Sequence, residues 1–245
     1  MTDRSCSRRG FMRFCGSAAT LATALPGDVP AAVAPEHAYA PATLVWSDGS
    51  PVTGASLEPE REFVFFYPYR STPCFLLRLA APAAAGMAVA GSGGRTYRWA
   101  GGVGPDRAVV AYSAICAHKL SHPSPSVSFI GYRPRPVGFL GEGNRVQRRA
   151  GVIQCCSEHS IYDPAQGASV LSGPAPYPLA AIGLDDSGVG LIAQAVHGEP
   201  VFDRYFERFG FRLGLEFGEG QFRQSVGEAT VVQATEEFTR QRIQC

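Results

Sequence analysis

Two short cysteine–histidine motifs constrain this sequence more than any other feature. The first is Cys116-Ala117-His118, and the second is Cys156-Ser157-Glu158-His159. Each motif follows an apolar, strand-like run, Ala108–Ile115 for the first and Val152–Gln154 for the second. Thiol and imidazole side chains are preferred ligands of iron and zinc. We therefore expect a fold that brings two strand ends together around one metal centre.

The order of the ligands favours an iron–sulfur cluster. In one type of [2Fe–2S] cluster, one iron takes two thiolates and the other takes two imidazoles, so each loop supplies one ligand of each kind. The predicted ligands are Cys116, His118, Cys156 and His159. A Cys₂His₂ zinc site uses the same ligand types, but its two histidines are usually paired with each other at short spacing. Zinc and a chance pairing without metal are the alternatives.

The rest of the chain is typical of an all-β protein. Its 245 residues include 28 glycines and 19 prolines, which favour turns over long helices. Short β-branched and aromatic runs are separated by turn residues, a pattern of antiparallel sandwiches and barrels. These runs are Ala42–Trp46, Glu62–Tyr67, Cys74–Leu79, Tyr97–Ala100 and Val189–Ala195.

The pattern changes after residue 196. Aromatic residues in Val201–Phe209 recur at helical spacing and predict a helix, whereas Phe211–Phe217 alternates like a strand. Gln233–Ile243 is compatible with a final helix or with an extended arm. We expect residues 197–245 to form a mixed α/β C-terminal extension.

The N-terminus is typical of a twin-arginine export signal. Ser7–Arg13 contains the paired arginines, and a short apolar run follows from Phe14 to Leu25. Ala32-Val33-Ala34 and Ala38-Tyr39-Ala40 both have the form of a cleavage site, although proline follows each. We expect residues 1–40 to be a signal and linker and the mature protein to be periplasmic. Membrane contact is expected only if the signal is retained.

Overall charge points to no nucleic-acid partner, because the formal net charge is only +1. Locally, the part of the connection between the two motifs that runs from Arg133 to Arg149 contains five arginines and one glutamate, an excess of four positive charges. This connection is either a docking surface for an acidic partner or a solvated hairpin. The residues concerned are Arg133, Arg135, Arg145, Arg148, Arg149 and Glu142.

Several segments resemble the small Rieske subunit of arsenite oxidase. They are Gly101–Pro105, Val110–Ser113 running into Cys116, Glu62–Pro68 with Pro73-Cys74, and the twin-arginine start. The resemblance covers about residues 43–195. It implies a Rieske-type antiparallel β-sandwich at 41–196 with a small cluster-binding subdomain, whose loops lie near 112–122 and 154–174.

The same resemblance implies cofactors and partners. One [2Fe–2S] cluster per chain would relay electrons between a large molybdopterin-containing subunit and a c-type cytochrome. No bond chemistry is expected from this chain, and it contributes no catalytic residue. The alternative functions are the Rieske subunit of a quinol-oxidising membrane complex and a zinc-stabilised binding module.

The sequence departs from the Rieske pattern near the second motif. Many members carry a disulfide between the loops, and the corresponding positions here are Ser121 and Glu158. The spacing from His159 to Asp163 is one residue shorter than usual, which makes Cys155 a rival of Cys156. We prefer Cys156 because it keeps the Cys-x-x-His spacing. No counterpart of residues 197–245 is known to us in that subunit.

Four other side chains have expected roles. Ser160 and Tyr162 are candidates to donate hydrogen bonds to cluster sulfurs or to a cysteine thiolate. Cys74 is expected to be a buried apolar residue, and His122 an exposed loop residue that is not a ligand.

Overall fold

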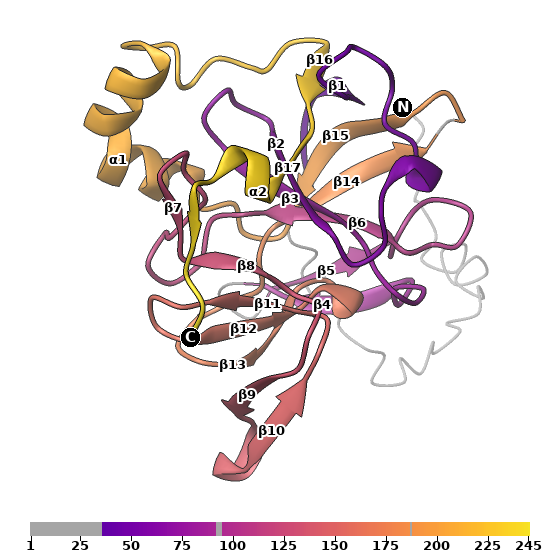
Figure 1. The fold of residues 1–245 in the computed structure, drawn as a ribbon, viewed down its shortest axis with the longest axis vertical. Coiled ribbons are helices and arrows are strands. Elements are labelled where there is room, and N and C mark those ends of the chain that lie inside the picture. The colour runs from indigo at the N-terminus through magenta and orange to yellow at the C-terminus, as the bar shows by residue number, and fades with distance from the viewer. Residues whose placement is uncertain (1–35, 92–94, 187) are drawn as a thin grey trace, which may run out of the picture. The chain divides into compact units, whose positions relative to one another are not determined.

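The computed structural model describes residues 36–91, 95–186 and 188–245 (Figure 1). The predicted twin-arginine motif, the apolar run after it and the candidate cleavage site at residues 32–34 lie outside the described residues. Within the described ranges, no helix is both long and apolar enough to cross a membrane.

Eight strands form the larger sheet, in the order β16-β1-β15-β14-β6-β3-β2-β17. All neighbours are antiparallel except β1 and β16, which run parallel. Their bounds are β1 Glu36–Val45, β2 Glu62–Phe66, β3 Pro73–Arg78, β6 Val109–Ser113, β14 Ala181–Asp186, β15 Leu191–His197, β16 Ala229–Val231 and β17 Gln233–Ala234.

The central strands of this sheet are buried on both faces. On β2, Phe63 and Phe65 belong to one core, while Val64 between them belongs to a second core. On β3, Leu76 and Phe75 divide between the two cores in the same way. Successive side chains of a strand point to opposite faces, so a strand between two cores needs apolar residues at every position. This explains the continuous apolar runs in the sequence.

Four strands form a smaller sheet in the order β13-β12-β11-β8. Their bounds are β8 Ile130–Arg133, β11 Val152–Cys155, β12 Ser160–Asp163 and β13 Ser169–Ser172. Ile130, Ile153 and Tyr162 from this sheet share the second core with Phe75 and Tyr112 of the larger sheet. The prediction of antiparallel sheets with a small subdomain that carries the second motif is confirmed.

Short elements complete the fold. Figure 1 shows the β9–β10 hairpin extending away from the smaller sheet. The remaining strand pairs are β4 Met87–Ala90 with β5 Thr96–Trp99, β9 Val137–Leu140 with β10 Val146–Arg149, and β7 Val127–Ser128 with β18 Gln241–Arg242. Single helical turns of the 3₁₀ type lie at Gly54–Ser56, Glu142–Asn144 and Pro164–Gln166.

The predicted strand over Phe211–Phe217 is wrong, because helix α1 runs without interruption from Phe202 to Phe217. Its inner face buries Phe202, Tyr205, Phe206 and Leu213 against the first core. Phe211 and Leu215 are instead exposed on the outer face, 85% and 75% respectively. The apparent alternation therefore arose from apolar residues on two different faces of one helix.

The last segment is an extended arm interrupted by one helical turn. β17 and the turn α2, Thr235–Phe238, precede β18. β16 and β17 lie at the two edges of the larger sheet, while β1 begins at Glu36. The predicted domain boundaries at 40/41 and 196/197 stay predictions. Residues before the first boundary and residues after the second both pair within the larger sheet.

The extension also covers His122, which is half-buried and not exposed as predicted. Its ring centroid lies 4.8 Å from that of Tyr205 and 4.9 Å from that of Phe209, both on α1. Its Nδ1 lies 2.8 Å from the carbonyl oxygen of Leu120. Burial lowers the pKa of His122 to about 4, because a charged imidazole would lose its hydration there.

Acid should therefore destabilise the fold through His122. The unfolded chain binds this proton near pH 6.5 and the folded chain only near pH 4, so stability present above pH 6.5 is lost as the pH falls between these values. We expect a loss of about 2 kcal/mol in the free energy of unfolding, measured by urea denaturation at pH 7.5 and pH 4.5. His122→Phe should reduce this difference, whereas His37→Gln should keep it. An unchanged difference in His122→Phe would contradict the assignment.

Candidate metal-cluster site

The first loop follows β6 and closes on itself. The amide of Cys116 donates to the carbonyl oxygen of Ser121 at 2.9 Å, and the amide of Leu120 donates back to the carbonyl oxygen of Cys116 at 3.0 Å. Before the loop, Ala114 is tied to Pro73 of β3 by a backbone hydrogen bond of 2.9 Å. These bonds fix Cys116 at the end of a central strand and leave Ala117–Lys119 at the tip.

The second loop is the turn of the β11–β12 hairpin. Cys155, the last residue of β11, lies directly opposite Ser160, the first residue of β12. Residues 156–159 form the turn between them. The amide of Cys156 donates to the carbonyl oxygen of Phe129 at 2.6 Å, which fixes the start of the turn. His159 at its end has a positive φ of 58°.

The two loops bring Cys116 and Cys155 together. Both residues are buried in the second core, and their thiols are close enough for each to shift the pKa of the other. The hydroxyl of Tyr162 lies 3.3 Å from Cys116 Sγ. Tyr162, predicted to contact a cysteine, therefore does contact one.

Proton affinity differs sharply between the two thiols. The hydrogen bond from Cys155 and the one from Tyr162 lower the pKa of Cys116 to about 6, although burial opposes this. The pKa of Cys155 is raised by its hydrogen bond to Cys116 and by burial. Hydrogen bonding, against the effect of burial, thus favours a thiolate on Cys116, the form in which cysteine binds metals.

Cys156 lies on the other side of the turn and forms a disulfide with Cys245. A disulfide sulfur offers no thiolate to iron. The physical reason is the alternation of side chains along β11, which directs Cys155 into the second core and the next residue away from it. The predicted group of Cys116, His118, Cys156 and His159 is therefore not brought together in this structure, and the ligand roles stay a prediction.

The two histidines differ in their surroundings. Nδ1 of His118 is buried and has no hydrogen-bond partner, and the same holds for the Oγ of Ser160. His159 is exposed. No three histidine, cysteine, aspartate or glutamate side chains of the described residues are placed to hold a single metal ion.

Serine hydroxyls connect the loops where many Rieske proteins have a disulfide. Ser121 Oγ lies 2.6 Å from Ser157 Oγ. The resemblance assigns the disulfide positions to Ser121 and Glu158, whereas in the structure Ser121 contacts Ser157. Glu158 instead forms an ion pair with Lys119, with 3.5 Å between Oε1 and Nζ. The shift follows from the hairpin register, in which Cys155 takes the place expected for Cys156.

Two of the five arginines between the motifs have structural partners. Arg149 forms an ion pair of 2.6 Å with the fully buried Asp163, the residue after Tyr162. Arg133 donates to the carbonyl oxygen of Ile243 at 2.7 Å and to the Gln154 side chain at 3.1 Å. The exposed basic residues of the β9–β10 region are therefore Arg135, Arg145 and Arg148.

The C-terminal arm is attached beside the second loop by several bonds. The amide of Ile243 donates to the carbonyl oxygen of Ser128 at 2.9 Å, and β18 pairs with β7. Arg242 lies 3.1 Å from the buried carboxylate of Glu62. Burial raises the pKa of Glu62, and the charge of Arg242 opposes that rise. Cys245, for which the sequence indicated no partner, ends this arm at the disulfide.

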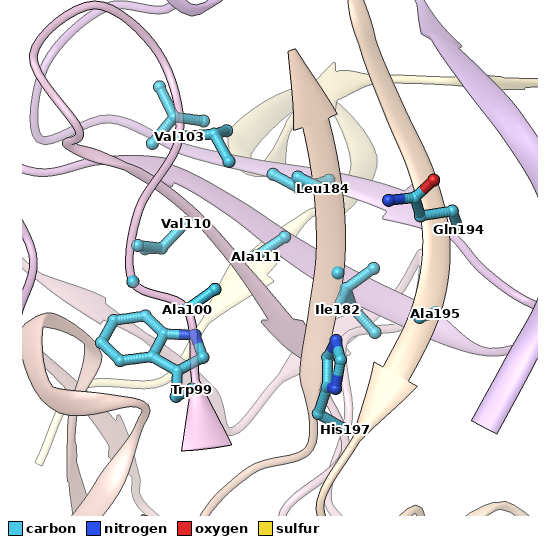
Figure 2. A pocket seen from close by; sticks show the side chains of 13 residues that line it. Trp99, Ala100, Val103, Val110, Ala111, Ile182, Leu184, Gln194, Ala195 and His197 are labelled. Atoms are coloured by element: carbon cyan, nitrogen blue, oxygen red, sulfur yellow. The ribbon is translucent and has the colours of Figure 1, made fainter. Parts of the chain in front are cut away.

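A pocket of about 150 Å³ lies outside both loops (Figure 2). It is lined mainly by apolar groups of β5, β6, β14 and β15, including Trp99 and Ile182, with Gln194 and His197 as polar side chains. None of its lining residues belongs to the two loops, so it is not the metal-cluster site.

By the chemistry of their donor atoms, the residues at the loop ends offer three of the four ligands of a [2Fe–2S] cluster. Cys116 and Cys155 come from different loops and supply two sulfurs, and His118 supplies an imidazole whose Nδ1 lacks a partner. Buried polar atoms are rarely left unpaired. The unpaired His118 Nδ1 and Ser160 Oγ are therefore consistent with a bound group between the loops.

Two known proteins are similar to this chain. No family model matches the chain. A curated relative, iodate reductase subunit IdrB of Denitromonas iodatirespirans, is 28% identical over 197 residues, which cover 80% of this chain and 84% of the relative. The soluble domain of Rieske protein II from Sulfolobus acidocaldarius is 26% identical, covers 64% of this chain and 77% of its own, and has a TM-score of 0.37.

Loss of the terminal disulfide should destabilise the protein. It joins residues 89 positions apart, so it removes much conformational freedom from the unfolded chain. We expect Cys245→Ser to lower the free energy of unfolding by about 2–4 kcal/mol without reductant. Wild-type protein with reductant should match the variant. Alkylation of Cys156 in unreduced, denatured wild-type protein would contradict the disulfide.

Proposed function

We propose that this chain is a divergent Rieske protein and the electron-transfer subunit of a molybdopterin oxidoreductase that acts on an oxyanion. The observation that carries the proposal is a pair of buried free thiols. Cys116 and Cys155 come from different loops and interact with each other beside the hydroxyl of Tyr162. The curated relative is a subunit of iodate reductase, and the sequence resembles the small subunit of arsenite oxidase. Both names describe enzymes of oxyanions.

Bound between the loops, a [2Fe–2S] cluster would accept and release one electron at a time. The residues of this chain set its environment. Cys116 and Cys155 would hold one iron as thiolates. The Tyr162 hydroxyl would donate to the Cys116 sulfur, and such hydrogen bonds raise the reduction potential of a cluster. Burial of both cysteines keeps water from the sulfurs.

The β9–β10 hairpin is the surface we assign to the large subunit. Arg145 and Arg148 are exposed on it, together with Leu140 and Val146. Exposed apolar residues among positive charges suit a protein partner with an acidic surface. A c-type cytochrome would bind at a different surface of the chain and exchange electrons with the cluster there.

Export by the twin-arginine route to the periplasm belongs to the same proposal. Within the described residues, Ala38-Tyr39-Ala40 lies in β1. Tyr39 packs edge-on against Tyr67 and Tyr69, with ring centroids 6.2 and 5.9 Å apart. Cleavage after Ala40 would remove this packing, so we assign cleavage to the site that ends at Ala34.

Metal analysis and purification from the native cell test the proposal. We expect about two iron and two acid-labile sulfide per chain, an EPR signal after reduction, and a large molybdenum-containing chain in the same complex. Arg145→Glu with Arg148→Glu should release the large chain and keep the iron. Their matched control is Arg107→Glu, an exposed arginine outside the hairpin.

Two results would contradict the proposal in different ways. One zinc ion per chain and no iron would favour the zinc-stabilised binding module. Iron in a complex with quinol-oxidising membrane subunits, and no molybdenum, would favour the membrane alternative.

A further inference from the structure

We propose that the carboxylate of Glu158, and not the imidazole of His159, is the fourth ligand of the cluster. The ligand set would then be two cysteines, one histidine and one glutamate: Cys116, Cys155, His118 and Glu158. This inference rests on the proposed function, because it assumes that a [2Fe–2S] cluster is bound between the loops.

The register of the β11–β12 hairpin determines which cysteine thiol is available as a ligand. The ligand motif of the second loop spaces its two ligands as Cys-x-x-ligand. Counted from Cys156, that spacing ends at His159, but Cys156 is joined to Cys245. Counted from Cys155, whose thiol reaches Cys116, the same spacing ends at Glu158. The thiol that is available therefore selects the glutamate.

Contacts between the loop tips bring Glu158 to the first loop. Ser157 of the second loop touches Ser121 of the first, and Glu158 reaches Lys119, the residue directly after His118. The carboxylate thus lies beside the ammonium group of a residue at the tip of the first loop. The ion pair is half-exposed, so exchanging Lys119 for a metal would cost little.

His159 is exposed at the end of the turn and has a closely packed backbone. Its side chain is exposed, and its carbonyl oxygen packs closely against Gly173, where a Cβ atom would come within 2.6 Å. Gly173 itself has a positive φ of 88°. This close contact holds the backbone of His159 in place, while its side chain is exposed. Glu158 needs only a side-chain rotation to leave Lys119.

Both loops contain a buried polar atom that has no hydrogen-bond partner. Ser160 is fully buried beside Cys155 in the hairpin, and its Oγ has no partner. Nδ1 of His118 is likewise buried and unpaired in the first loop. Each loop thus contributes one buried polar atom without a partner among the described residues.

A carboxylate ligand has a chemical consequence. Replacing a neutral imidazole by an anionic carboxylate adds one negative charge next to the iron, which disfavours the arrival of an electron. The cluster should therefore have a lower reduction potential than the same cluster with two imidazoles.

Counting the imidazoles bound to iron tests the inference. The full-length protein is produced with ¹⁵N-histidine, reduced and measured by pulsed EPR. We expect one strongly coupled ¹⁵N imidazole in the wild-type protein, one in His159→Asn, and two in Glu158→His. The potential of Glu158→His should be higher than that of the wild type. Iron content and thermal unfolding confirm that each variant is loaded and folded.

The outcomes separate the inference from the proposed function. Two coupled imidazoles in the wild type, falling to one in His159→Asn, would overturn the inference and leave the proposed function standing. A wild-type protein without iron and without an EPR signal would overturn both.

Discussion

The antiparallel register of β11 and β12 is the constraint on which the rest of the site depends. It sets Cys155 opposite Ser160 and directs the Cys155 side chain into the core shared by the two sheets. A shift by one residue would move every side chain of the hairpin to the opposite face. The thiol contact with Cys116, the hydroxyl of Tyr162 and the serine pair between the loops all depend on this register.

The C-terminal extension supports both loops from outside. Helix α1 packs against the first loop through His122, and Arg204 on α1 donates to the carbonyl oxygen of Ala117 at 3.5 Å. The terminal arm reaches the second loop through Arg133 and the disulfide at Cys156. Where many Rieske proteins join the loops to each other by a disulfide, this chain has a serine contact and ties one loop to its own C-terminus.

The sequence predicted the general architecture well, because strand length and apolar runs are local signals. The runs at Glu62–Tyr67, Cys74–Leu79 and Ala108–Ile115 correspond to β2, β3 and β6, and the start of α1 followed from its aromatic spacing. Cys74 is buried, as expected. The end of α1 was missed, because Phe211 and Leu215 lie on an exposed face that carries no periodic signal of burial.

The choice between Cys155 and Cys156 is decided by register and not by composition, so two adjacent cysteines could not be separated from the sequence. The sequence feature that favoured Cys155 was the spacing from His159 to Asp163, which is one residue shorter than usual. Counted from Glu158 to Asp163, the spacing has the usual length. The partner of Cys245 could not be predicted, because it depends on where the arm crosses the smaller sheet.

The most direct measurement is the iron content of single cysteine variants, purified side by side. The structure predicts that Cys155→Ser loses the cluster, while Cys156→Ser and Cys245→Ser both retain it with the same EPR signal. Loss of the cluster in Cys156→Ser but not in Cys155→Ser would contradict the register on which this account of the site is built.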